Sequence, residues 1–336
     1  MTTRTKEIIA LVAVALFVVI FYIRKVAGRG AIEFPTWLSM LVILLILASL
    51  LWILVLTIRG RLIERRVVFL YVGIAVALPL FMSLTQKISV SPEVKQLYDA
   101  IVELPEGSKV LLSFDYDPPS APELQPMAES IIRLCLQRDL KLIIMGLWPQ
   151  GPQQANLALE KVFDDEDIAA KNLQYGVDYV NLGFQSGNEF VIQRMGGSFQ
   201  SMFQSDYEGT RYEDIPLVRN VRNFSNVDFS VNFSAGFPGT VEWVQIAVDR
   251  FGLDLGAGNT AVQAPQMYVY LNAGQLNGLL GGMSGAAEFE DVADYRAKGT
   301  KFMLSQSFAH AVAIAFILIG NVAFFMSGRK SRLKGD

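Results

Sequence analysis

Two aspartates that follow an apolar run are the residues best suited to chemistry. Asp115 and Asp117 come after Val110 to Phe114, a mainly apolar segment typical of a strand buried on both faces. Residues two apart on a strand share a face, so both carboxylates are predicted to point into the crevice where open α/β sheets bind ligands. Such a pair can hold a hard cation or divide acid and base roles. The alternative is that both acids cap turns beside Pro118 and Pro119.

The tetrad Phe114-Asp-Tyr-Asp117 resembles the nucleophile motif of haloacid dehalogenase-type phosphatases. That family also requires a hydroxyl residue at the end of its second strand. The segment Ile144 to Trp148 contains none, so the resemblance is confined to the tetrad and we assign no family.

Three glycine-containing loops, 183–188, 234–240 and 256–260, also follow predicted strands and are expected to line the same crevice. Glycine allows close backbone approach, and short polar side chains there can orient a ligand, although the same residues also make turns. The pattern identifies no cofactor, metal or ligand. The candidate ligand-binding residues, besides the two aspartates, are Ser186, Asn188, Ser234, Thr240 and Asn259.

Several catalytic classes are excluded by residues that the polar part of the chain lacks. The only histidine, His310, lies in the last apolar stretch, so Ser-His-Asp catalysis, Cys-His catalysis and histidine-ligated metal sites are excluded there. The only cysteine, Cys135, cannot form an internal disulfide and completes the apolar stripe of a predicted helix. We therefore expect Cys135 to be a core residue. No P-loop is present, and no G-x-G-x-x-G follows a strand.

Four long apolar stretches surround one polar block, three before it and one after it. Each is close to the roughly 20 residues that a helix needs to cross a membrane. Arg24 and Lys25 stand where a signal-peptide cleavage site would follow the first stretch, so it is expected to be a retained anchor. The predicted transmembrane helices are about 8–23, 34–58, 67–84 and 302–326.

Flanking basic residues predict the orientation of these helices. With the N-terminus inside, ten lysines and arginines flank the spans in the cytoplasm, against three in the short loop Arg24 to Arg29. Both termini are then cytoplasmic, and the central domain of a multi-pass cell-membrane protein is extracytoplasmic. Residues 91–300 contain 28 acidic and 14 basic side chains, so phosphate backbones are repelled and nucleic acid is excluded as a partner.

The polar block alternates short apolar runs with helical patterns, which predicts an α/β fold with a mostly parallel, Rossmann-like doubly wound sheet. The aromatic and polar stretch Gly196 to Asn226 does not fit this alternation and is expected to be an insertion. The predicted domains are 1–86 with three transmembrane helices, 87–301 as the extracytoplasmic α/β domain, and 302–336 with the fourth helix and a basic tail. The predicted strands are 110–114, 142–147, 179–184, 227–233, 253–255 and 276–280.

Polar residues inside the fourth predicted span are candidates for contacts within the membrane. Ser307, His310 and Asn321 share one helical face. Such groups usually face other helices, so hydrogen bonding between helices is favoured over proton or ion handling.

These observations favour a non-catalytic function. The leading hypothesis is an integral membrane protein whose acidic α/β domain binds a ligand or partner, as a subunit of an assembly with other membrane proteins or with itself. The alternative is a membrane-anchored extracytoplasmic enzyme that uses Asp115 and Asp117, through metal-assisted hydrolysis or transfer. A transport component is a third hypothesis, weakened by the few polar residues in the spans.

Overall fold

The computed structural model describes residues 36–59, 64–81, 88–295 and 297–332, so the first predicted span, 8–23, lies outside the described residues. The chain divides into two compact units. One consists of residues 1–86 and 304–336, and the other of residues 87–303.

The described part of the first unit is helical. It contains α2 (Thr36–Ile58), α3 (Arg65–Ala77), the short 3-10 helix η1 (Leu78–Phe81) and most of α13 (Lys298–Arg332). By length and composition, α2 and α13 can each cross a membrane. Tyr71 of α3 meets Phe316 of α13 edge to face, with ring centroids 5.6 Å apart. Two of the four predicted spans therefore correspond to helices of the required length.

The second unit is built on a sheet of six parallel strands in the order β3-β2-β1-β4-β5-β6. The chain adds strands outward from β1 to β3, returns to place β4 beside β1, and then adds strands in the opposite direction. This is the order of a doubly wound Rossmann-like sheet, and its switch point lies between β1 and β4. The predicted α/β class and parallel sheet are confirmed. The strands are β1 (Lys109–Asp115), β2 (Lys141–Gly146), β3 (Tyr179–Phe184), β4 (Phe229–Ser234), β5 (Leu255–Asn259) and β6 (Leu279–Gly281).

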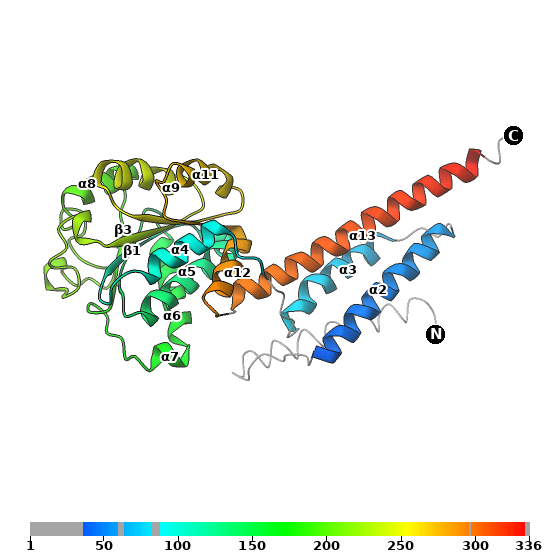
Figure 1. Cartoon of the computed structure of the whole chain (residues 1–336), viewed down its shortest axis with the longest axis horizontal. Coiled ribbons are helices and arrows are strands. Elements are labelled where there is room, and N and C mark those ends of the chain that lie inside the picture. The colour runs from blue at the N-terminus through cyan, green and yellow to red at the C-terminus, as the bar shows by residue number, and fades with distance from the viewer. Residues whose placement is uncertain (1–35, 60–63, 82–87, 296, 333–336) are drawn as a thin grey trace. The chain divides into compact units, whose positions relative to one another are not determined.

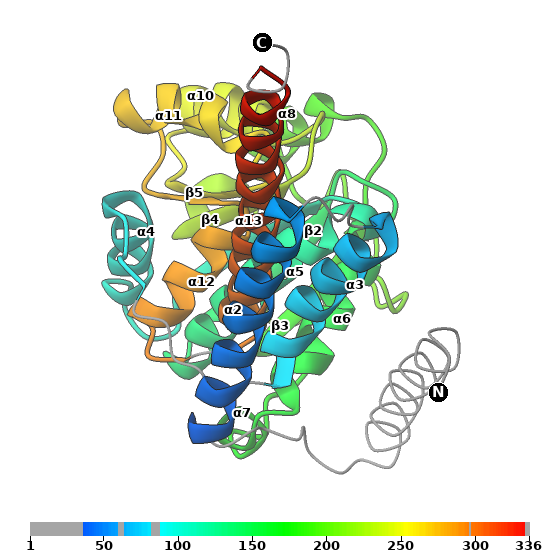
Figure 2. The same cartoon turned by 90° about the vertical axis from the view of Figure 1, so that its right-hand side faces the viewer.

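Helices cover both faces of the sheet (Figures 1 and 2). Alternation along β1 sends Leu112 and Phe114 into one core and Leu111 into the other. Cys135 is fully buried in the first core, as predicted. The first face is covered by α4 (Pro92–Val102), α5 (Ala121–Gln137), α6 (Gly151–Phe163) and α12 (Gly282–Val292), and α7 (Glu166–Ala169) follows α6. The second face is covered by α8 (Glu189–Gly197), α9 (Thr240–Trp243), the π-helical turn η5 (Val244–Val248), α10 (Asp249–Phe251) and α11 (Ala264–Asn272).

The strand predicted at 253–255 is wrong in its bounds, because β5 runs through the glycine-rich stretch that was expected to be a loop. Glycine is required there by close packing. A Cβ on Gly256 would lie 2.3 Å from Leu97 Cδ1, and one on Gly258 would lie 2.9 Å from Phe233 Cδ1. Leu97 of α4 and Phe233 of β4 therefore pack directly on the two glycines of β5.

The irregular segment predicted at 196–226 contains two 3-10 helices, η3 (Tyr212–Asp214) and η4 (Phe224–Asn226), and covers the edge of the sheet. Tyr207 N–H donates a 2.8 Å hydrogen bond to the Asn181 carbonyl of β3. This contact satisfies a backbone group that an edge strand otherwise exposes.

A buried glutamate caps the start of α13. Glu290 of α12 is fully buried, and its carboxylate accepts hydrogen bonds from the backbone N–H groups of Ala297, Gly299 and Thr300 at 2.7–2.9 Å, and from the Thr300 hydroxyl at 2.7 Å. The first N–H groups of a helix have no partners within it, and a carboxylate there also interacts favourably with the helix dipole. The cap fixes the first turn of α13 to the α/β unit.

Candidate functional site at the carboxyl ends of the strands

The switch-point crevice is occupied by Asp115, the last residue of β1. Its side chain is fully buried and shares the strand face of Ser113, which lies two residues earlier. Oδ1 accepts a hydrogen bond from Leu147 N–H at 2.7 Å. Oδ2 accepts hydrogen bonds from Ser113 Oγ at 2.9 Å, Asn232 Nδ2 at 2.6 Å and Trp243 Nε1 at 3.1 Å. The carboxylate thus has four donors from four elements of the chain.

The polar network continues across β4 and β5. Thr240 Oγ1 donates to Asn232 Oδ1 at 2.7 Å, and Asn259 Nδ2 donates to Thr240 Oγ1 at 2.9 Å. All three side chains are buried. The side chains satisfy one another within the protein, so a ligand could reach them only by breaking these bonds. We refer to Asp115, Asn232, Thr240, Trp243 and Asn259 as the crevice network.

Two opposing effects set the ionisation of Asp115. Their balance raises the Asp115 pKa from 3.8 to about 6, and the largest cause is burial, because a carboxylate loses its hydration there. The hydrogen bonds from Leu147, Ser113, Trp243 and Asn232 lower the pKa, but by less than burial raises it. A raised pKa in a crevice is a mark of functional sites, and it also occurs at buried structural carboxylates.

Asp117 does not join Asp115. β1 ends at Asp115, so the shared strand face that was expected for the pair does not extend to Asp117. Asp117 is half-buried, precedes the 3-10 helix η2 (Pro118–Ser120), and accepts a hydrogen bond from Ser120 Oγ at 3.0 Å. This contact is local, but it comes from a side-chain hydroxyl, and the Asp117 side chain makes no cap hydrogen bond to η2.

The other predicted site residues divide into three groups. Thr240 and Asn259 belong to the crevice network. Ser234 is buried, and its hydroxyl closes a turn by donating to the Gly236 carbonyl at 3.0 Å. Ser186 and Asn188 are exposed in the loop after β3, and Asn188 begins α8 with φ 51° and no side-chain cap.

Sequence reasoning missed Asn232 and Trp243. A signal for Asn232 was present, because Ser230, Asn232 and Ser234 alternate with apolar residues along β4 and so place three polar groups on one face. Parallel pairing then sets Asn232 beside Ser113 and Ser234 beside Asp115.

The loops around the crevice expose apolar side chains at their tips. Phe190 is 65 % exposed, Phe237 is 62 % exposed and Val262 is 85 % exposed. The loops 148–150, 184–188, 235–239 and 260–263 contain no charged residue, although the domain is strongly acidic. Contacts between loops hold them together, such as the 2.8 Å hydrogen bond from Trp148 Nε1 to the Pro238 carbonyl. We call Phe184, Phe190, Phe237 and Val262, with these loops, the carboxyl-end surface.

One buried polar atom at this surface has no partner. Among the buried side-chain nitrogen and oxygen atoms of the described residues, only Glu189 Oε2 lacks a hydrogen bond. Glu189 directly precedes the exposed Phe190 at the start of α8. A buried acceptor without a partner needs an explanation. One explanation is that a bound partner supplies the missing hydrogen-bond donor.

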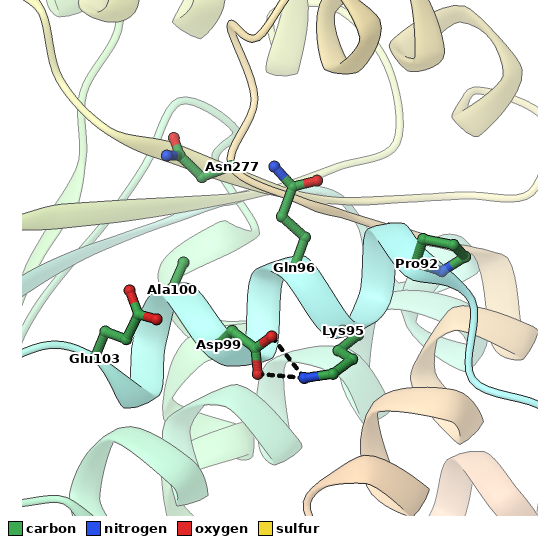
Figure 3. Close-up of a pocket in the computed structure, with 7 residues that line it drawn as sticks. All are labelled: Pro92, Lys95, Gln96, Asp99, Ala100, Glu103 and Asn277. Atoms are coloured by element: carbon green, nitrogen blue, oxygen red, sulfur yellow. Dashed lines mark hydrogen bonds and ion pairs between the residues drawn. The ribbon is translucent and has the colours of Figure 1, made fainter.

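Surface grooves also lie away from the crevice, such as one beside Gln204 and Arg211 and two on the first face of the sheet. One of these two, of about 420 Å³, runs along α4 and is lined by Gln96 and Asn277 (Figure 3). Lys95 and Asp99 in it pair with each other at 2.6 Å, and Asn277 accepts from Leu255 N–H. The other, of about 500 Å³, lies between α5 and α6, where Lys298 pairs with Glu129 at 2.7 Å. The charged pairs in both grooves are satisfied within the chain.

No group of three or more histidine, cysteine, aspartate or glutamate side chains in the described ranges is placed to hold a metal ion. No protein family, curated protein or solved structure matches this chain. The function is therefore argued from the chemistry of these residues.

Proposed function

We propose that this chain is a multi-pass membrane protein whose extracytoplasmic α/β domain, residues 87–301, binds a protein partner through the carboxyl-end surface, as a non-catalytic subunit of a membrane assembly. The observation that carries the proposal is the contrast between two places. The crevice, where doubly wound sheets take ligands, is filled by hydrogen bonds of the chain itself. The loops around it expose uncharged, apolar tips.

The composition of these loops fits a protein interface. Interface cores are poor in charged residues and rich in aromatic ones, and buried aromatic anchors carry much of the binding energy. Phe184 at the end of β3, Phe190 in the first turn of α8 and Phe237 in the loop after β4 supply three aromatic rings beside loops that contain amide and hydroxyl side chains. The 14 excess acidic charges of residues 91–300 lie outside these loops and favour a partner with basic residues around the contact.

The binding test is a comparison of two variants purified in mild detergent. Phe190→Ala combined with Phe237→Ala removes two anchors, and Leu157→Ala removes an apolar side chain that is 47 % exposed on α6. We expect the double variant to lose a co-purifying protein, with affinity lowered about tenfold or more, and Leu157→Ala to retain it. Equal recovery of that protein with both variants would refute the carboxyl-end surface as the binding site.

The orientation rests on the distribution of lysine and arginine, and labelling in intact cells tests it. In a Cys135→Ser background, a cysteine at Leu157 should react with a membrane-impermeant maleimide, and one at Lys334 should be protected. The reverse pattern would place the domain in the cytoplasm.

An extracytoplasmic enzyme is the second candidate, favoured by the raised pKa of Asp115. Catalysis by Asp115 would require the crevice network to open, because Leu147 N–H and Trp243 Nε1 donate hydrogen bonds to its carboxylate oxygens. It would also leave Asp117 to contribute from a separate turn.

A further inference from the structure

The helix α13 is exposed over much of its surface, and one line of exposed residues with a regular spacing carries Gln306, His310 and Asn321. Its members are Gln306, His310, Ala313, Ile317, Gly320 and Phe324, which are separated by four, three, four, three and four residues, with Asn321 beside Gly320. All seven are exposed. Alternation of three and four residues is the pattern of a left-handed coiled-coil seam, the commonest packing of membrane helices. We call these seven residues the α13 seam.

The opposite face of α13 is covered. Leu304, Val312 and Ile319 are 8 %, 5 % and 6 % exposed. Phe316, on the same side, meets Tyr71 of α3 edge to face. The seam therefore points away from the helices that the structure describes in this unit.

The seam carries hydrogen-bonding groups that the described chain does not satisfy. The side chains of His310 and Gln306 form no hydrogen bond with any described residue. Asn321 Nδ2 donates to the Ile317 carbonyl at 3.0 Å, which leaves its side-chain oxygen as an acceptor. Polar groups that face lipid are costly, so membrane helices turn them toward protein.

The other apolar segments of the chain offer few partners for these groups. The first predicted span, 8–23, has Tyr22 as its only polar side chain. In α2, the hydroxyls of Ser49 and Thr57 donate to the carbonyls of their own helix at 2.8 Å. A partner for the seam must bring donors and acceptors at matching depths.

A second copy of the chain meets this requirement. Copies inserted in one membrane share an orientation, so a two-fold axis along the membrane normal brings each seam residue opposite its equivalent. Gln, Asn and neutral His each carry a donor and an acceptor, so each can pair with itself. A Cβ built on Gly320 meets no atom within 4 Å, which leaves room for a close helix.

We propose that the α13 seam forms a parallel, left-handed contact with the same seam of a second copy, which makes the protein a homo-oligomer within the membrane. This inference rests on the membrane insertion in the proposed function and supplies one partner of the assembly.

Disulfide cross-linking of the full-length protein in native membranes tests the seam. In a Cys135→Ser background, single cysteines replace Ile317 in the seam or Leu318 beside it, which have nearly the same depth and similar exposure, 62 % and 59 %. Oxidation should give a covalent dimer with Ile317→Cys and little with Leu318→Cys. Adding His310→Leu and Asn321→Leu to Ile317→Cys should weaken the association about threefold for each residue, whereas Leu318→Ala should leave it unchanged.

Three results would overturn the proposal. A stronger dimer from Leu318→Cys would assign the contact to another face. No dimer at either position, in protein that carbonate does not extract from the membrane, would show that this helix does not self-associate. A cross-link within one chain between cysteines at Ala13 and Ile317 would identify the first span as the occupant. Carbonate extraction of the protein would instead refute the membrane insertion, and the variants of Phe190 and Phe237 test the partner without changing the seam.

Discussion

Replacing Asp115 with alanine should destabilise the α/β domain severely. The backbone N–H of Leu147 and the indole N–H of Trp243 would lose their acceptor, and neither can turn to find another. A buried donor left without a partner costs about 1–3 kcal/mol. The two unpaired donors and the lost packing should therefore lower the free energy of unfolding by about 3–5 kcal/mol in total. Asp117→Ala is the matched control. Asp117 is half-buried and has one side-chain partner, so its loss should cost under about 0.5 kcal/mol.

The effect of Asp115→Ala should also depend on pH, with a defined sign. Folding raises the Asp115 pKa from 3.8 to about 6, so the unfolded chain releases this proton at lower pH than the folded chain does. The stability that Asp115 contributes is fully present below about pH 4, and part of it is lost as the pH rises to about 6. The pKa change corresponds to about 3 kcal/mol. The alanine variant should therefore be destabilised more at pH 4 than at pH 7.

Urea unfolding in mild detergent at the two pH values measures both effects. Trp243 is 1 % exposed and directly bonded to Asp115, so its fluorescence reports on the crevice. The difference in unfolding free energy between the wild type and Asp115→Ala cancels the titration of the other carboxylates. A small, pH-independent difference, with partner binding or an activity lost, would refute the structural role of Asp115 and revive the enzyme hypothesis.

Three further predictions concern the core and the start of α13. Cys135→Ala should lower the free energy of unfolding by about 1–2 kcal/mol, because Cys135 is fully buried. In the wild type, burial raises the pKa of the Cys135 thiol to about 12, so maleimide should modify this thiol only after urea unfolds the domain. Gly151→Ala should cost more than about 3 kcal/mol in thermal unfolding, since its Cβ would lie 1.9 Å from the Phe114 carbonyl oxygen, whereas Gly197→Ala, with no atom within 4 Å, should shift stability by under about 0.5 kcal/mol. Glu290→Gln should cost about 2–4 kcal/mol in urea unfolding, because an amide N–H₂ would face the N–H groups at the start of α13; an unchanged midpoint would show that the cap contributes little.

The strands that a sequence predicts best are those with mainly apolar runs. β1 and β2 lie within one residue of their predicted bounds, because Val, Ile and Leu dominate these two runs, and β3 matches its predicted bounds although Asn181 interrupts its apolar residues. β5 was misjudged, since Leu-Gly-Ala-Gly-Asn lacks the side chains that identify a strand. The small residues there are explained by Leu97 of α4, which packs on Gly256 from far away in the sequence. Tertiary packing, rather than local propensity, decided this element.

The candidate site was predictable in part for the same reason. Asp115 could be found because it ends an apolar run, and Thr240 because a helix begins there. The contact from Trp243 joins residues 128 apart and has no local signal. Glu123 lies three residues after Ser120, which is the spacing of a capping box, but its carboxylate accepts from Ala261 N–H at 2.7 Å. Local motifs of this kind compete with distant donors, and here the distant donor prevailed.

The free energies involved argue that recognition occurs at the rim of the crevice. Opening the crevice network would leave the donors on Leu147 and Trp243 unpaired, at a cost of about 3–5 kcal/mol before any ligand contact forms. A ligand with an intrinsic dissociation constant of 1 μM has about 8 kcal/mol to offer, so that cost would weaken it to roughly the millimolar range. Contacts to Phe190 and Phe237 require no such opening, because both rings are already exposed. The proposed partner would therefore bind with the smallest free-energy loss at the rim of the crevice.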